Sequence, residues 1–70
     1  MHYIVLKQSE LEPKATVGSV VYPISRPDYG TARDDERALG IPCRSVTLNE
    51  DGDYPFFVMA CEDMQVVRHD

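Results

Sequence analysis

The sequence predicts one small, mainly β domain over residues 1–70, with a single short helix. Short segments alternate apolar and polar residues, turn residues separate them, and one central stretch breaks the β pattern. Seventy residues allow one domain with a thin core. We expect a small SH3-like barrel or a strongly bent antiparallel sheet. The alternative is an open α+β sheet with the helix packed across it.

Two strands are expected in the first third of the chain. Residues 2–7 are rich in β-branched and aromatic side chains, which favour strands. A polar connection over residues 8–14 follows. The second strand begins after Gly18 and places three apolar side chains on one face: Val20, Tyr22 and Ile24. Pro23 cannot donate a ladder hydrogen bond, so it indicates an edge position or the end of the strand.

A helix of about two turns is expected near residues 32–39. Thr31 is a candidate N-cap, and Asp34 three residues later comes close to a capping box. Gly40 and Pro42 end the helix. A helix this short is not stable alone in water, so it must pack on the sheet. The apolar side chains expected to face the core are Ala32, Leu39 and Ala38.

Residues 45–49 form the next expected strand, and they alternate cleanly. The inward side chains are Val46 and Leu48, and the outward ones are Ser45, Thr47 and Asn49. Asp51-Gly52 follows, and Asp-Gly between two alternating runs is a strong signal for a tight β-hairpin. The returning strand covers residues 54–59, with Phe56 and Val58 in the core. A short turn over residues 60–64 and a closing strand over residues 65–68 complete the chain.

The net charge of −5 is unevenly distributed. Residues 1–44 balance their acids and bases, so the excess lies in the C-terminal third of the chain. Five acids occur between residues 45 and 67 without a base: Glu50, Asp51, Asp53, Glu62 and Asp63. An acidic face repels phosphates, which disfavours nucleic acid and anionic membranes as partners. It suits a basic protein surface, or solubility alone.

The residues that could support catalysis are few. Cys43 and Cys61 are too few for a disulfide framework or a four-ligand zinc site, so we expect reduced thiols in a cytoplasmic protein. The first residues have no basic leader and no cleavage site. His2 and His69 lie at the two ends, poorly placed to activate a nucleophile. We therefore expect no enzyme activity, no cofactor, no metal site and no membrane span.

The charges around the expected helix allow two interpretations. They form either an exposed, charge-laced surface with weak pairs, or an internal ion pair between Asp28 or Asp35 and an arginine that fixes the loop. A metal site is disfavoured, because consecutive helical carboxylates point in different directions.

Three sequence runs, DYGTARDDER, SVTL and DGDYPFF, resemble a group of small uncharacterised proteins from bacteriophages and bacteria. Members of the group read roughly DYG-x-A-x-DD-x-R, then SVTL, then GDYP-x-F, and the match covers residues 18–67. The matching residues are Asp28, Tyr29, Gly30, Ala32, Asp34, Asp35, Arg37, residues 45–48, residues 52–55 and Phe57. The resemblance implies a phage or mobile-element origin and carries no activity with it.

These observations together predict a small, non-catalytic protein-interaction module. The candidate partner-binding residues are Tyr29, Arg33, Asp34, Asp35, Arg37, Glu50, Asp51 and Asp53. One alternative is an acidic phage inhibitor that mimics nucleic acid and blocks a host defence or regulatory protein. A second alternative is a small barrel that binds nucleic acid, although the arginine-rich stretch is neutralised by its own acids.

Overall fold

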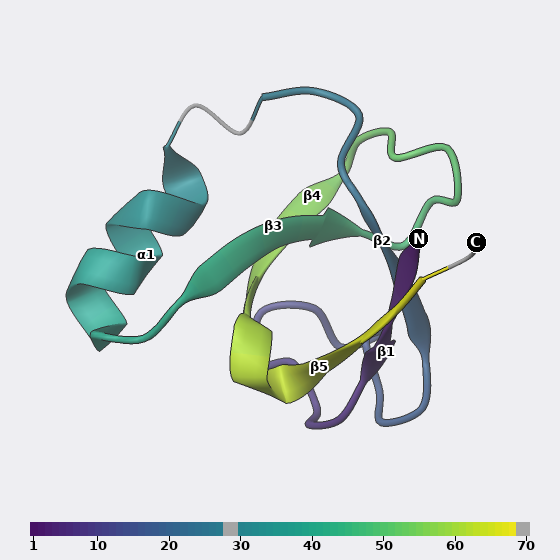
Figure 1. Ribbon diagram of the computed structural model, residues 1–70, viewed down its shortest axis with the longest axis horizontal. Coiled ribbons are helices and arrows are strands. Elements are labelled where there is room, and N and C mark those ends of the chain that lie inside the picture. The colour runs from purple at the N-terminus through teal and green to yellow at the C-terminus, as the bar shows by residue number, and fades with distance from the viewer. Residues whose placement is uncertain (28–29, 69–70) are drawn as a thin grey trace.

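Five antiparallel strands form one unclosed sheet, and one short helix packs on it (Figure 1). The computed structural model describes residues 1–27 and 30–68. The strands are β1 (His2–Val5), β2 (Val20–Pro23), β3 (Cys43–Thr47), β4 (Phe56–Ala60) and β5 (Met64–Val67). The helix is α1 (Thr31–Leu39), and a 3₁₀ turn, η1 (Cys61–Asp63), separates β4 from β5. The order β4-β3-β2-β1-β5 leaves β4 and β5 at the two edges.

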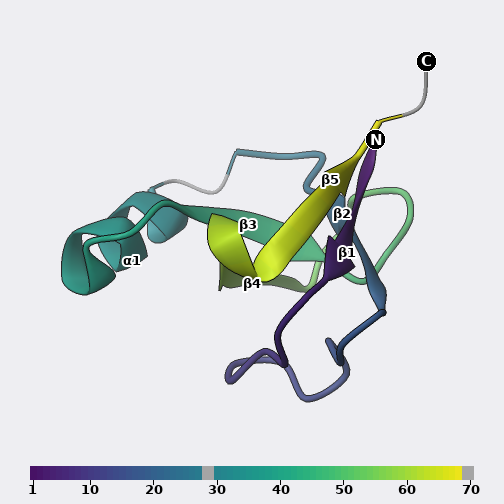
Figure 2. The same ribbon diagram turned by 60° about the horizontal axis from the view of Figure 1, so that its bottom comes forward.

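The sheet bends at β2, which divides its pairing between two halves. Its first residues, Val20 and Val21, pair with β1, and its last, Tyr22 and Pro23, pair with β3. Figure 2 shows β1 and β5 running across the direction of β3. The expectation of a mainly β protein with a bent antiparallel sheet and one short helix is therefore confirmed. Within the described part of the chain the strands do not close into a barrel.

The main core lies between the two halves of the bent sheet. Its buried members are Tyr3, Val5, Ala15, Val21, Val46, Met59 and Met64, with Leu48 and Phe57 packed against them. The hydroxyl of the buried Tyr3 accepts a hydrogen bond from Nη1 of Arg44 at 2.8 Å. This bond satisfies a polar atom that would be costly to bury alone, and it raises the pKa of the arginine.

A second, smaller core lies between α1 and the β3–β4 hairpin. It consists of Ala32, Cys43 and Val58, with Ile41 and Ala60 at its border. The sequence predicted that Ala32 faces the core, and that is confirmed. Leu39 and Ala38 were expected there too, and that prediction was wrong, because both are exposed. Leu39 lies on the same side of the helix as Ala32, two turns later, but there it borders a groove instead of the core.

The faces of β3 also differ from the prediction. Ser45 and Thr47 were expected to point to solvent, but both are buried. Both lie on the same face of β3 as Cys43, against which Ala32 of α1 packs, so this face is not the solvent face. At the far end of the strand, the loop after β3 contacts Thr47. The Thr47 hydroxyl donates a hydrogen bond to the carbonyl of Asp53 at 2.7 Å, which allows it to be buried. Phe56, expected in the core, is only half-buried.

The ends of α1 are set by glycines. Gly30 is the N-cap residue, so the capping box predicted from Thr31 and Asp34 is not formed, and Thr31 is the first helical residue. Gly40 ends the helix as predicted. Its N–H donates to the carbonyl of Glu36 at 2.8 Å in a left-handed conformation that favours glycine.

The β3–β4 hairpin is confirmed, but its turn is wider than predicted. The strands pair from Cys43 opposite Ala60 to Thr47 opposite Phe56, so the loop spans residues 48–55. The N–H of Gly52 closes a turn on the carbonyl of Asn49 at 3.0 Å. The tip of the loop is attached to the chain after β2, because the carbonyl of Gly52 accepts two hydrogen bonds from Ser25, one from its N–H and one from its hydroxyl.

Candidate functional site

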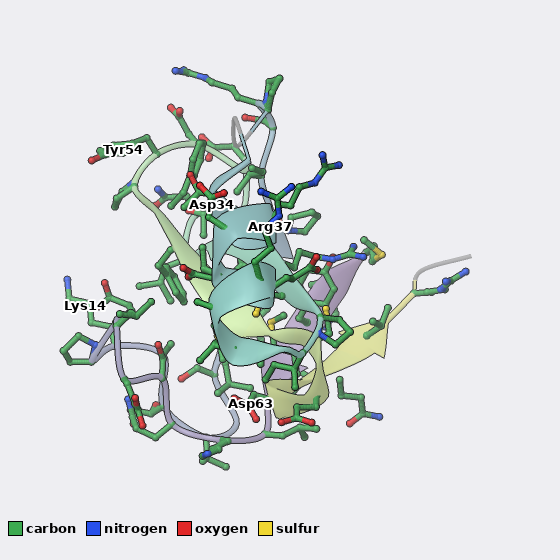
Figure 3. The ribbon with its side chains drawn as sticks, turned by 90° about the vertical axis from the view of Figure 1, so that its left-hand side faces the viewer. Lys14, Asp34, Arg37, Tyr54 and Asp63 are labelled. Carbon is green, nitrogen blue, oxygen red and sulfur yellow. The ribbon has the colours of Figure 1, made fainter. Side chains whose placement is uncertain are left out.

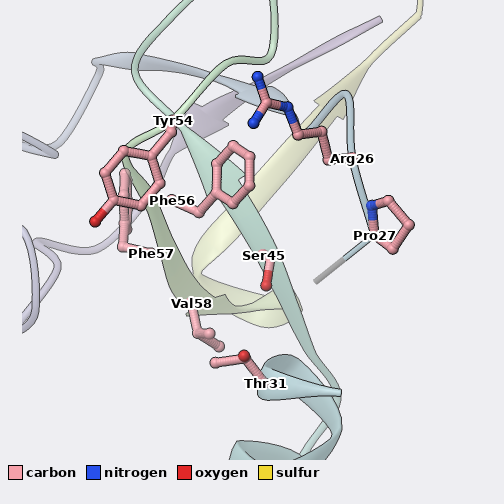
Figure 4. A pocket seen from close by; sticks show the side chains of 8 residues that line it. All are labelled: Arg26, Pro27, Thr31, Ser45, Tyr54, Phe56, Phe57 and Val58. Carbon is pink, nitrogen blue, oxygen red and sulfur yellow. The ribbon is translucent and has the colours of Figure 1, made fainter. Parts of the chain in front are cut away.

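An open cavity of about 360 Å³ lies between the start of α1 and the first half of β4 (Figure 4). We call it the aromatic cavity. It is lined by Arg26, Pro27, Thr31, Ser45, Tyr54, Phe56, Phe57 and Val58. Its volume is that of a small ligand site or of one or two side chains of a partner.

The aromatic side of this cavity is presented to solvent. Tyr54 is 72% exposed, and its ring meets that of Phe56 edge-to-face, with centroids 5.7 Å apart. Such a pair is a favourable geometry for aromatic rings. A large aromatic side chain that the fold leaves in water is a candidate anchor for a partner, since tyrosine is enriched at interface hot spots.

The loop that carries Tyr54 is held by its own hydrogen bonds. Nδ2 of Asn49 donates to the carbonyls of Asp53 and Tyr54, at 3.1 and 3.0 Å. The Asp51 carboxylate accepts the N–H of Asp53 at 3.0 Å, and the Asp53 carboxylate accepts the N–H of Tyr54 at 2.9 Å. Tyr54 is therefore held at the cavity mouth by a pre-organised loop, which lowers the entropic cost of binding.

An ion pair closes one rim of the cavity. Nη2 of Arg26 lies 3.1 Å from Oδ1 of Asp53. Both side chains are more than half exposed, so the pair contributes little to stability. Its effect is local, because it neutralises Asp53 and places the guanidinium beside the aromatic rings (Figure 4).

The candidate residues on the helix are spread around it. Arg33, Asp34 and Arg37 are exposed, and Asp35 is half-buried. Asp34 and Arg37 both lie on the outer side of α1 (Figure 3). Tyr29 lies outside the described residues. The ion pair expected for Asp35 is not formed within the described part of the chain. The corresponding prediction for Asp28 also lies outside it.

The acids of the C-terminal third lie in two separate places. Glu50, Asp51 and Asp53 belong to the loop before β4, and Glu62 and Asp63 belong to η1 after it. Figure 3 shows Tyr54, which neighbours the first group, and Asp63 at opposite ends of the molecule. The two groups are separated by β4, which is about 16 Å long at ~3.3 Å per residue.

A second groove, of about 240 Å³, lies at the far end of β4. We call it the acidic groove. Its lining includes two leucines that are about two-thirds exposed, Leu11 and Leu39, and its charged members are Lys7, Glu10, Glu62 and Asp63. The second half of β4, from Val58 to Ala60, forms one of its walls.

The sequence did not predict these two sites. Arg26, Pro27 and Phe56 of the aromatic cavity were not among the candidates, although the run Tyr54 to Phe57 is visibly aromatic. Phe56 of this run was assigned to the core, because alternation shows which residues share a face and not which face is covered. Leu11, a single apolar residue in a polar connection, was expected to tuck under it, but that expectation was wrong, because Leu11 is 67% exposed.

Two thiols are the candidate nucleophiles among the described residues. Cys43 and Cys61 are both free thiols. Burial, followed by the charges of Glu36 and Asp35, raises the pKa of Cys43, so its thiol is protonated at neutral pH. The ring of His2 lies beside Tyr22 instead of a cysteine. Residues 1–27 and 30–68 contain no group of three His, Cys, Asp or Glu side chains that could hold a metal ion.

No family model, no curated protein and no solved structure matches this chain. Within the residues that the structure describes, no helix has the length and apolar character needed to cross a bilayer. The function of the two sites is therefore inferred from their geometry and chemistry.

Proposed function

We propose that the chain is a small, non-catalytic module that binds another protein, with the aromatic cavity at the centre of the contact surface. The observation that carries this proposal is the exposure of Tyr54, at 72%, beside a preformed aromatic cavity. A partner side chain that enters the cavity removes both rings from water. Aromatic residues on a rigid support are the typical anchors of protein interfaces.

The charge distribution supports a protein partner over a nucleic acid. The chain carries a net charge of −5, and acids precede and follow β4 at its two ends. The exposed Arg33 and Arg37 share α1 with Asp34, Asp35 and Glu36, so the helix offers no basic stripe for phosphates. A basic protein surface is the complementary partner.

The arrangement of the acids also favours this function over mimicry of nucleic acid. A mimic requires one continuous row of negative charges. Here two groups stand at opposite ends of β4, and Asp53 is neutralised by Arg26. The absence of catalysis remains part of the proposal, and the protonated, buried thiol of Cys43 supports it.

We also propose that the bent sheet is an SH3-like barrel that stays open between β4 and β5. Two observations support this relationship. β1 lies between β2 and β5, so the first and last strands are neighbours, and one 3₁₀ turn joins the two edge strands. The resemblance of the sequence to phage and bacterial proteins supports a phage-related origin, and two free thiols suit the cytoplasm.

Affinity capture with matched variants tests the proposed function. The full chain is immobilised beside Tyr54→Ala and Val17→Ala and exposed to a bacterial lysate, and the bound proteins are identified by mass spectrometry. Val17 is 67% exposed and lines none of the cavities described above, so it controls for the loss of an exposed side chain.

We expect the original chain and Val17→Ala to retain one protein that Tyr54→Ala loses. Calorimetry with that protein should show that Tyr54→Ala binds it at least about tenfold more weakly than the original chain, as expected for a hot-spot residue. Equal retention by Tyr54→Ala would contradict the role of the cavity. Capture of nucleic acid alone would contradict the proposed function.

A further inference from the structure

The outer edge of β4 has no strand beside it. β4 is the last strand in the sheet order, and its pairing within the described residues is with β3 alone. Backbone groups that point outward from such an edge are unpaired and form a template for another strand. The register of the hairpin shows which groups these are.

One hydrogen bond shows which residue pairs of β3 and β4 are hydrogen-bonded. The N–H of Cys61 donates it to the carbonyl of Pro42 at 2.9 Å. These two residues continue the register in which Cys43 faces Ala60. In an antiparallel ladder, hydrogen-bonded and non-hydrogen-bonded pairs alternate, so the next pair, Cys43 and Ala60, does not exchange hydrogen bonds. The N–H of Cys43 is consistent with this assignment, since it donates to the carboxylate of Glu36 at 2.9 Å and not to β4.

The same alternation assigns the rest of β4. Phe57 and Met59 exchange hydrogen bonds with β3, and Phe56, Val58 and Ala60 direct their N–H groups to the open edge. Within the part of the chain that the structure describes, β4 pairs with no strand except β3, and no loop carbonyl accepts a hydrogen bond from these three N–H groups. The edge therefore offers three donors, spaced two residues apart.

The two sites lie along this same edge. Phe56 and Val58 line the aromatic cavity, and Val58 and Ala60 line the acidic groove. A chain that runs along β4 would therefore place side chains of one face into both sites in turn, at a spacing of two residues.

We propose that β4 binds an extended segment of the partner protein as a sixth strand. This inference rests on the proposed function and specifies the partner. The backbone of the segment bonds to the N–H groups of Phe56, Val58 and Ala60, and its side chains enter the two sites. Strand addition of this kind takes affinity from main-chain hydrogen bonds and specificity from side-chain sites.

The chemistry of the sites defines the segment. The aromatic cavity takes an apolar or aromatic side chain. The acidic groove has three acids, Glu10, Glu62 and Asp63, against Lys7, so it takes a lysine or arginine whose stem packs on its leucines. Phe56 and Ala60 are four positions apart, so the apolar residue and the basic residue are four positions apart in the segment.

The charges also decide against a second copy of this chain. Two β4 edges paired antiparallel about Val58 bring the Glu62 end of one copy beside the Asp53 end of the other. Each copy carries a net charge of −5, so the pair is repelled. A basic segment of another protein meets no such repulsion.

Proline at position 60 tests the edge with little strain. Ala60 has a φ of −65°, which is the angle that proline requires. Ala60→Pro removes one outward N–H and none of the bonds to β3, whereas Ala60→Val adds bulk and keeps that N–H.

The probe is a phage-displayed library of random nine-residue peptides, selected on the full chain. Enriched peptides are then synthesised with blocked ends and measured on both variants and on Tyr54→Ala.

We expect enriched peptides with an apolar residue and a lysine or arginine four positions apart. Their affinity falls at least about tenfold on Ala60→Pro and less than about threefold on Ala60→Val, consistent with the loss of a backbone hydrogen bond. Amide exchange adds an independent measurement. Binding slows exchange at Phe56, Val58 and Ala60 and changes it little at Phe57 and Met59, which are already bonded to β3.

Two results would overturn strand addition. One is a selection that enriches no peptide. The other is a set of peptides that bind Ala60→Pro as tightly as the original chain. If those peptides still lose binding on Tyr54→Ala, the aromatic cavity binds a partner in another way, and the proposed function stands. If lysate capture and peptide binding are both unaffected by Tyr54→Ala, the role of the aromatic cavity in the proposed function fails as well.

Discussion

Gly52 shows how one residue fixes the loop that carries the candidate site. Its φ is +79°, a conformation that side chains rarely adopt, and a Cβ there would lie 2.8 Å from the carbonyl oxygen of Pro23 and from the backbone nitrogen of Ser25. The close approach is what allows Ser25 to donate two hydrogen bonds to the Gly52 carbonyl. The loop before Tyr54 is thus attached to the chain after β2.

Gly52→Ala is expected to destabilise the fold by about 2 kcal/mol or more, because left-handed strain adds to contact with rigid backbone atoms. Gly18→Ala is the matched control. It has a φ of +87° but open space around it, so it should cost only about 1 kcal/mol. Urea unfolding followed by circular dichroism measures both. Equal losses for the two variants would contradict the role assigned to the close approach.

Cys43 links burial to pH dependence. Its side chain is 7% exposed, and burial is the main cause of its raised pKa, with Glu36 and Asp35 next. A thiol whose pKa is higher in the folded state than in the unfolded chain stabilises the fold while it is protonated. That contribution is complete below the unfolded value, about 8.5, and is lost as pH rises through the folded value.

The free energy of unfolding should therefore fall faster above about pH 8.5 in the original chain than in Cys43→Ala, because only the former must ionise a buried thiol. Chemical denaturation at a series of pH values measures the difference between the two curves. Val17→Ala, which removes an exposed apolar side chain and no thiol, should keep the pH dependence of the original chain. Parallel curves for the original chain and Cys43→Ala would contradict the prediction.

At the scale of elements, α1 is attached to the sheet by a polar contact as well as by its small core. The carboxylate of Glu36 accepts the N–H of Cys43 at 2.9 Å, across the turn that follows the helix. Ala32 alone is buried on this helix, so apolar packing is weak. The charges around this helix predicted only an exposed surface or an ion pair, and the sequence pattern gave no signal for the contact of Glu36 with Cys43.

Removing the acceptor should loosen the helix from β3. Glu36→Ala is expected to cost about 1–2 kcal/mol, because a part-buried N–H loses its partner, while Glu36→Gln keeps an acceptor and should cost less. Arg37→Ala, on the exposed side of α1, should change stability by no more than about 0.5 kcal/mol. Thermal unfolding of the three variants measures how much stability each of them loses. The prediction is wrong if Glu36→Ala resembles Arg37→Ala.

At the scale of the whole molecule, the position of each charge matters more than the total. Glu50 and Glu62 are both exposed, and neither makes a hydrogen bond within the described part of the chain. They stand at opposite ends of β4, one in the loop and the other in the acidic groove. Reversing either one changes the net charge equally, so the two variants separate local from global electrostatics.

Glu62→Lys should weaken binding of the enriched basic peptides severalfold at low salt, and the effect should shrink at high salt, because exposed charges are screened. Glu50→Lys should have little effect. Calorimetry at two salt concentrations measures both. Equal weakening by the two variants would indicate that one continuous acidic face binds the partner, as in a mimic of nucleic acid.

The sequence by itself determined the local structure of this protein. Alternation, together with β-branched and aromatic residues and turn signals, predicted five strands within a few residues of their observed bounds, because these signals act locally along the chain. Gly40 and Pro42 predicted the end of α1, because a left-handed residue and a missing N–H act locally. The excess of negative charge was likewise visible from composition.

The tertiary structure alone decided which surfaces are covered. Thr47 is buried where the loop after β3 folds back on it, and Leu39 is exposed because α1 ends beside a groove. The loop at residues 48–55 is attached to Ser25, a residue far away in the sequence, through the carbonyl of Gly52. Alternation shows which side chains share a face, but burial depends on what packs against that face. The aromatic cavity and the open edge of β4 arise from such long-range contacts.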